Sequence, residues 1–115
     1  MNYKASCHCG SVAFAVQAEV DALIECNCSI CSRKGSLLFF VPRADVAFST
    51  PESAMSTYTF NTHRIRHNFC STCGCAPVGF GTDAKGHEMA AVNARCLEDV
   101  DLSAFTINAY DGRSA

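Results

Sequence analysis

The residues of this 115-residue chain that could do chemistry are above all its nine cysteines. They fall into three tight groups and one outlier: Cys7-x-Cys9, Cys26-x-Cys28-x2-Cys31, Cys70-x2-Cys73-x-Cys75, and Cys96. Spacings of one or two residues let a tight turn present several thiolates to one metal ion, whereas a disulfide across so few residues is strained. An odd number of cysteines also leaves at least one unpaired in any intramolecular disulfide scheme. Metal binding is therefore the first chemistry to consider.

Two of these groups have the spacing of a closed zinc site. Cys7 and Cys9 form a CxC motif, Cys70 and Cys73 form a CxxC motif, and together the two motifs could supply the four thiolates of a structural zinc. A glycine follows each motif and permits the positive-φ turns that let backbone N–H groups face the sulfurs. The alternative is that Cys7 and Cys9 are ordinary small core residues, which the combined pattern disfavours.

The middle group is different in kind. Cys26, Cys28 and Cys31 supply three thiolates from one short segment and, if the other pairs are committed, no fourth protein ligand. A zinc ion with three protein ligands and an open position distinguishes catalytic from structural sites. The alternative is a second structural site completed by Cys75, Cys96 or a histidine. Spacing alone leaves both open, because it does not show which distant groups meet in space.

Charged and titratable residues near these groups have two interpretations each. Arg33 and Lys34 follow the three-cysteine group directly and would pair with the carboxylates of an anionic substrate, although solvated surface cations are more common. His63 and His67 are four residues apart, which is a zinc spacing on a helix but places them about 13 Å apart along a strand. We expect both histidines to be structural or to face solvent.

The elements that must position these residues read as short strands, because bulky apolar residues alternate or form brief runs between turn signals. The expected strands cover residues 12–16, 36–41, 46–48, 58–60, 65–69, 77–80, 88–92 and 105–108, with a helical turn over 29–34 and a hairpin near 61–62. The phenylalanines expected in the core, of which one or two would wall the open site, are Phe39, Phe40, Phe60, Phe69 and Phe80. The fold class is therefore all-β, with about eight short strands clamped by metal.

Length and composition limit the class of protein further. We expect residues 1–115 to form a single domain. The net charge of −2 provides no basic excess for nucleic acid, and no apolar run approaches the roughly 18 residues of a membrane span. The first residues lack the apolar region of an export signal, so we expect a cytoplasmic protein. Clustered thiols in a reducing compartment more often bind metal than form disulfides.

The cysteine groups in this order resemble the glutathione-dependent formaldehyde-activating enzyme family, which includes the centromere protein V type. The residues that carry the resemblance are Cys7-His8-Cys9-Gly10-Ser11-Val12, Cys26-Asn27-Cys28-Ser29-Ile30-Cys31-Ser32-Arg33-Lys34-Gly35, Phe69-Cys70-Ser71-Thr72-Cys73-Gly74 and Val92-Asn93-Ala94-Arg95-Cys96-Leu97-Glu98-Asp99. The resemblance implies a zinc-bound β-tent fold of short antiparallel strands. It also implies two zinc ions per chain and the joining of glutathione to formaldehyde, a carbon–sulfur lyase reaction that gives S-hydroxymethylglutathione.

The same resemblance implies a role for each ligand set. Cys7, Cys9, Cys70 and Cys73 would hold the structural zinc. The catalytic zinc would be held by Cys26, Cys28 and Cys31. The partners would be a glutathione-like thiol and an aldehyde, and the alternative function is a non-catalytic zinc module of the same fold.

Two features depart from the family pattern. Many members carry Ser or Thr where this chain has Cys75, which we expect to be a buried thiol. Many members are also longer at the C-terminus, so the short end here would remove part of a substrate wall. The resemblance places Cys96 near the catalytic metal, where a fourth-ligand role competes with simple burial.

Overall fold

Ten strands carry most of the fold in the computed structural model, which describes residues 1–114. The strands are β1 (Asn2–Ser6), β2 (Ala13–Gln17), β3 (Ala22–Cys26), β4 (Leu38–Pro42), β5 (Val46–Phe48), β6 (Met55–Tyr58), β7 (Arg66–Cys70), β8 (Val78–Thr82), β9 (Glu88–Asn93) and β10 (Thr106–Tyr110). The helical pieces are α1 (Cys31–Lys34) and the 3₁₀ turns η1 (Arg43–Asp45), η2 (Glu52–Ala54), η3 (Ala94–Cys96) and η4 (Leu102–Ala104). No helix among these residues has the length and apolar character needed to cross a bilayer.

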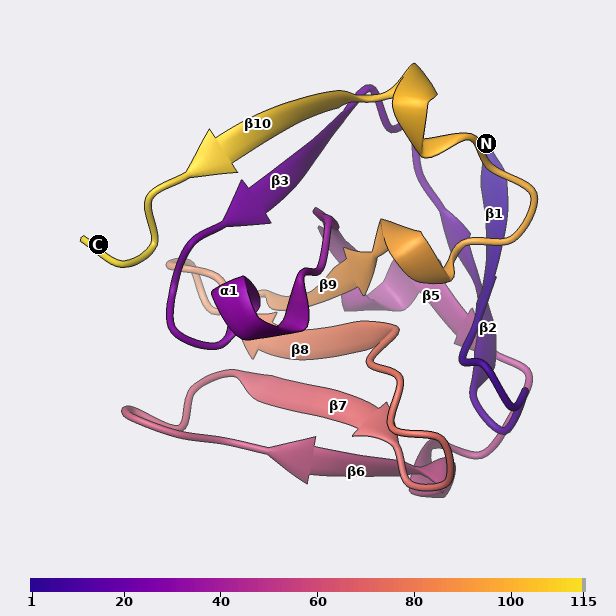
Figure 1. The fold of residues 1–115 in the computed structure, drawn as a ribbon. Coiled ribbons are helices and arrows are strands. Elements are labelled where there is room, and N and C mark those ends of the chain that lie inside the picture. The colour runs from indigo at the N-terminus through magenta and orange to yellow at the C-terminus, as the bar shows by residue number, and fades with distance from the viewer. Residues whose placement is uncertain (115) are drawn as a thin grey trace.

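The strands form two sheets. The smaller sheet has the order β1-β2-β5, and the larger has the order β10-β3-β4-β9-β8-β7-β6. All named strand pairs are antiparallel except β10 with β3, which run parallel. Figure 1 shows β3 and β10 at one end of the larger sheet and β6 and β7 at the other, with α1 between them. The protein is therefore mainly β, as the sequence predicts.

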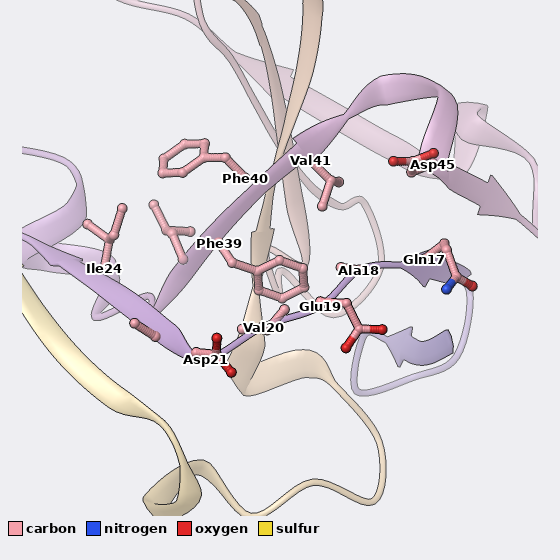
Figure 2. A pocket seen from close by; sticks show the side chains of 12 residues that line it. Gln17, Ala18, Glu19, Val20, Asp21, Ile24, Phe39, Phe40, Val41 and Asp45 are labelled. Carbon is pink, nitrogen blue, oxygen red and sulfur yellow. The ribbon is translucent and has the colours of Figure 1, made fainter. Parts of the chain in front are cut away.

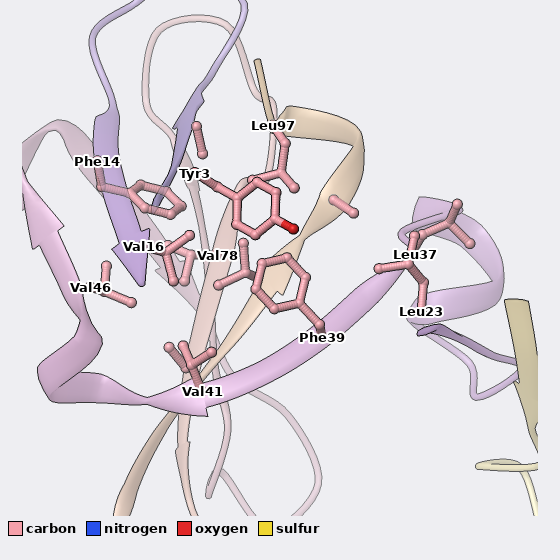
Figure 3. Packing of buried hydrophobic residues seen from close by; sticks show 14 of the residues in the cluster. Tyr3, Phe14, Val16, Leu23, Leu37, Phe39, Val41, Val46, Val78 and Leu97 are labelled. Carbon is pink, nitrogen blue, oxygen red and sulfur yellow. The ribbon is translucent and has the colours of Figure 1, made fainter. Parts of the chain in front are cut away.

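The core lies between the two sheets and is built from the inward face of each strand (Figure 3). Aromatic rings connect the layers: the centroids of Tyr3 and Phe39 are 6.3 Å apart. Within the smaller sheet, the ring centroids of Phe48 and Phe14 are 5.3 Å apart. The ring of Phe48 also lies 6.3 Å from that of Phe80 in the larger sheet, centroid to centroid. Burial of such side chains is the main stabilising term for a domain of this size. This packing fixes the strand ends from which the cysteine turns project.

The strand predictions overlap the observed strands, with two omissions. β1 and β3 were not expected from the sequence pattern, and each has only five residues. Of the five phenylalanines expected in the core, Phe39 and Phe80 are buried, whereas Phe60 and Phe69 are only partly buried. Phe40, expected in the core, is 53% exposed, because β4 alternates and directs Phe39 and Val41 inward instead. The predicted hairpin joins β6 to β7, and Asn61 has a φ of 57° in its turn.

Candidate metal centres

The CxC and CxxC motifs meet at one point in the fold. Cys7 and Cys9 lie in the turn between β1 and β2, while Cys70 ends β7 and Cys73 lies in the turn that follows. Their four Sγ atoms all lie within 4.8 Å of one another, and we call them the four-cysteine group. The Sγ atom of Cys9 is 3.7 Å from that of Cys7 and 3.6 Å from that of Cys70. All nine cysteines are free thiols.

These sulfur–sulfur distances fit a tetrahedral zinc site. Zinc–sulfur bonds of about 2.3 Å in a tetrahedron put the sulfurs about 3.8 Å apart. The observed separations are close to that value and far from the ~2.05 Å of a disulfide. The four-cysteine group therefore has the dimensions that four-thiolate zinc coordination requires.

The turns that carry this group are shaped by N–H groups that point at sulfur. The backbone N–H of Val12 donates to Cys7 Sγ at 3.3 Å, and that of Cys73 donates to Cys70 Sγ at 3.4 Å. Gly74 adopts the left-handed conformation, with φ of 81°, and its N–H donates to the carbonyl of Cys70. Backbone N–H groups from Cys75 and Cys9 lower the pKa of Cys73 to about 5. These N–H groups favour the thiolate, the form that binds metal, whereas burial raises the pKa of Cys7 despite the N–H of Val12.

The middle motif also brings its sulfurs together. Cys26 ends β3, Cys28 lies in the following loop and Cys31 begins α1. Their Sγ atoms lie within 4.8 Å of one another and form the three-cysteine group. The N–H of Cys28 donates to Cys26 Sγ and that of Cys31 donates to Cys28 Sγ, each at 3.5 Å. Within residues 1–114, no further Cys, His, Asp or Glu completes a set of four around these sulfurs.

The three sulfurs repel one another when charged. Desolvation, followed by the neighbouring Cys28 and Cys26, raises the pKa of Cys31 to about 12. At Cys28 desolvation acts in the same direction, but N–H groups of Cys31 and Ile30 outweigh it and the pKa is lowered. A divalent cation would let all three sulfurs ionise together, and an all-sulfur donor set suits zinc among the biological divalent cations. The donor chemistry of this group therefore fits a metal ion.

The family model described as glutathione-dependent formaldehyde-activating enzyme matches residues 2–111, which is nearly the entire chain. The chain belongs to the glutathione-dependent formaldehyde-activating enzyme family. This confirms the resemblance carried by the cysteine motifs.

A solved crystal structure has a similar fold. The crystal structure of a Rhodobacter sphaeroides protein, a structural genomics target, is similar to this chain with a TM-score of 0.78 and 26% sequence identity. The alignment covers 91% of this chain and 99% of that one. The fold described above for this chain has therefore also been observed by crystallography in another protein.

A cavity of about 280 Å³ is lined by residues that are close in sequence to cysteines of both groups, although no cysteine lines it. Its lining includes Ile30, which lies between Cys28 and Cys31 in sequence, and Gly74, which follows Cys73. The residues that bring polar or aromatic character to it include Lys34, His67 and Phe69. The link to the three-cysteine group is Lys34, whose pKa is affected by the charges of Cys31 and Cys28.

The two cations that follow the middle motif lie differently. Lys34 lines the cavity, where desolvation lowers its pKa and the negative charge of Cys31 and Cys28 opposes that shift. The Nη1 of Arg33 instead donates to the carbonyl of Ser29 at 2.7 Å on the exposed side of the turn. Of the two, Lys34 is the residue that a bound substrate in this cavity would meet.

His67, which the sequence pattern predicted to be structural or to face solvent, lines the cavity and is a candidate site residue. It projects from β7 into the cavity and stacks on Phe60, with ring centroids 5.4 Å apart. Desolvation and then the charge of Lys34 lower its pKa, so the imidazole is neutral at pH 7. No local spacing signals this position, because it depends on how β7 lies relative to α1. His63, in the turn before β7, has a φ of 57° and is exposed.

Cys75 and Cys96 join neither cysteine group. Both are partly buried rather than fully buried. Desolvation, followed by the nearby Cys75, raises the pKa of Cys96 to about 11, and Asn93 Nδ2 donates to its sulfur at 3.8 Å. Cys96, the last residue of η3, is therefore held as a neutral thiol.

A larger cavity lies elsewhere, between β3 and β4 (Figure 2). These strands are paired only at Ile24 and Leu38, and they diverge to leave about 440 Å³. Its lining combines the aromatic residues Phe39 and Phe40 with carboxylates and contains no cysteine or histidine. It therefore lacks the thiol and imidazole groups on which the chemistry of the cysteine groups depends.

Proposed function

We propose that this protein is a zinc-dependent enzyme that joins a thiol to a small aldehyde or cleaves their adduct, with glutathione and formaldehyde as the leading pair. The observation that carries the proposal is the three-cysteine group, which has no fourth protein ligand among the described residues. Lys34, close enough to Cys31 and Cys28 to feel their charge, lines a cavity together with His67. The family description points to the same substrates. Cys7, Cys9, Cys70 and Cys73 would hold a separate, structural zinc.

The chemistry of the open site follows from its donors. A zinc ion bound by Cys26, Cys28 and Cys31 would supply a Lewis acid that keeps an added thiol deprotonated near neutral pH. In the reaction the thiol sulfur attacks the carbonyl carbon, and a carbon–sulfur bond forms as the carbon–oxygen π bond opens. The proton lost by the thiol ends on the oxygen, so S-hydroxymethylglutathione forms without any redox partner.

The residues of the cavity would bind the substrate and move that proton. The Lys34 ammonium would pair with a carboxylate of a glutathione-like substrate, a charge-assisted contact that orients the sulfur. The neutral imidazole of His67 would accept the thiol proton and return it to the oxygen. Phe69 and Ile30 provide apolar walls that limit water in the cavity.

The test is product formation measured against the spontaneous condensation, which proceeds without any protein. Exchange between free formaldehyde and S-hydroxymethylglutathione would be followed by NMR with ¹³C-formaldehyde, with and without protein containing two zinc ions per chain. We expect faster exchange with the zinc-loaded protein and no acceleration by Cys28→Ser carrying one zinc. An exchange rate unchanged by the zinc-loaded protein would contradict catalysis and favour a non-catalytic zinc module.

A further inference from the structure

The C-terminal segment lies directly against the three-cysteine group. A Cβ atom placed on Gly112 would be 2.5 Å from the Sγ of Cys26 and 3.2 Å from the Cβ of Cys28. Real Cβ atoms essentially never approach another heavy atom within 3.0 Å, so any other residue at this position would displace the segment or the sulfur. The backbone of Gly112 therefore covers the Cys26 and Cys28 side of the group.

One side chain holds this segment in place. Asn27, which lies between Cys26 and Cys28, donates from Nδ2 to Asp111 Oδ1 at 2.9 Å. Its Oδ1 accepts from the backbone N–H of Arg113, also at 2.9 Å. Asn27 thus holds the chain on both sides of Gly112.

The strand register delivers the segment to this place. β10 pairs in parallel with β3, and Tyr110 lies opposite Cys26 at the end of the pairing. The N–H of Asn27 then donates to the carbonyl of Tyr110 at 3.2 Å. Figure 1 shows the C-terminal segment beside the loop from β3 to α1, with α1 and β7 beyond that loop.

We propose that residues 110–113 form a strap over the three-cysteine group, that Asn27 is its positioning residue, and that the strap slows metal exchange and directs incoming ligands to the side of α1. The inference rests on the proposed metal at this group. Ligands of the open position then approach from the cavity that contains Lys34. A strap on one side also restricts the size of thiol that the position accepts.

The test measures zinc release to a chelator from protein loaded with two zinc ions per chain. We expect two phases, of which the faster reports the three-cysteine group. Asn27→Ala removes both side-chain hydrogen bonds and should accelerate the fast phase about tenfold, a change equivalent to about 1.4 kcal/mol. The slow phase should not change. Asn108→Ala is the matched control, because Asn108 is an exposed asparagine of β10.

Two further variants keep the proposal testable if Asn27→Ala folds poorly. Asp111→Ala removes one hydrogen bond at an exposed position and should accelerate the fast phase about threefold. Gly112→Ala should displace the strap from Cys26 and change the thiolate-to-metal absorption of the Co²⁺-substituted protein, a signature that distant packing does not alter. Fast-phase rates of all three variants within about twofold of wild type would overturn the strap.

The outcome for the strap is separable from the outcome for the enzyme, because zinc release needs no substrate. A protein that shows the release effect but does not accelerate thiol–aldehyde exchange would contradict the proposed function alone. A protein that catalyses the exchange while Asn27→Ala releases zinc at the wild-type rate would contradict the strap alone. A wild-type chain that holds only one zinc would overturn both.

Discussion

Lys34 and His67 have different roles in the proposed site, one in substrate binding and the other in proton transfer. Lys34 and His67 come from different elements and line the same cavity, and the charge of Lys34 contributes to the lowered pKa of His67. A cation binds a carboxylate in ground and transition state alike, whereas a proton acceptor acts only as bonds change. Substitutions at the two positions should therefore affect different kinetic constants.

Lys34→Met should weaken substrate binding. Loss of a charge-assisted contact to a substrate carboxylate raises KM for glutathione about tenfold and leaves kcat nearly unchanged. Arg33→Met is the matched control, since Arg33 donates to the Ser29 carbonyl and not into the cavity, and its KM should stay at the wild-type value. Steady-state rates over a range of glutathione concentrations measure both constants. Equal effects of the two substitutions would contradict the role of Lys34.

His67→Gln should lower kcat about a hundredfold with little change in KM, because glutamine keeps the polarity but cannot accept a proton. A raised KM with an unchanged kcat would instead indicate a binding role. The control is His63→Gln, since His63 is exposed in the turn before β7.

The pH profile provides an independent measure of His67. Desolvation and Lys34 lower its pKa below 6.5, so the neutral form persists to lower pH and activity should be retained until the pH falls below that value. Lys34→Met removes one of these two causes, which raises the pKa of His67 and moves the acid limb of kcat toward pH 6.5. The titratable groups facing His67 are Lys34 from α1 and Tyr58 from β6. An acid limb that does not move in Lys34→Met would show that another group titrates.

At the scale of elements, the sequence predicted most strands because bulky residues alternate along them. Phe14 and Val16 of β2 are buried as the alternation indicates. β1 escaped prediction because its inward residues, Tyr3 and Ala5, differ greatly in size and form no clear pattern. β10 is exposed along its whole length, so its residues carry no signal that it pairs in parallel with β3.

The candidate site shows the same limit. Cysteine groups were readable because their spacing is local, and the structure brings together the sulfurs that the motifs suggest. His67 and the Asn27 strap depend on register between distant segments, which no short motif encodes. Spacing also suggested that the CxC and CxxC motifs join in one site, whereas the choice between a catalytic and a second structural site for the middle motif came only from the resemblance to a family.

Arg43 contacts aromatic rings of both sheets. Its guanidinium lies 5.3 Å from the ring centroid of Phe48 in β5 and 4.7 Å from that of Phe80 in β8, and it pairs with Glu52 at 2.9 Å. Arg43→Met keeps the aliphatic stem but removes the cation, and should lower the free energy of unfolding by about 1–2 kcal/mol. Urea unfolding measures the change, with Lys85→Met in an exposed turn as control. An effect no larger than that of the control would show that the cation–ring contacts contribute nothing.

At the scale of the whole molecule, the two cysteine groups connect different parts of the chain. The four-cysteine group joins the β1–β2 turn of the smaller sheet to the end of β7 in the larger sheet. The three-cysteine group lies within one segment of the larger sheet, from the end of β3 to the start of α1. A metal at the first group therefore closes a long loop between sheets, whereas a metal at the second closes only a local turn.

Removing one ligand from each group should separate stability from metal content. Cys73→Ser and Cys31→Ser are matched, since both residues are partly buried cysteines, and each should reduce the zinc content from two ions to one. Cys73→Ser should lower the free energy of unfolding by at least about 3 kcal/mol, because the folded state loses the zinc-binding free energy that links the two sheets. Cys31→Ser should change it by less than about 1 kcal/mol, since the affected turn is local and its sulfurs contribute little to the core. Zinc analysis with denaturant unfolding of both variants measures this, and equal destabilisation would contradict the assignment of separate structural and catalytic ions.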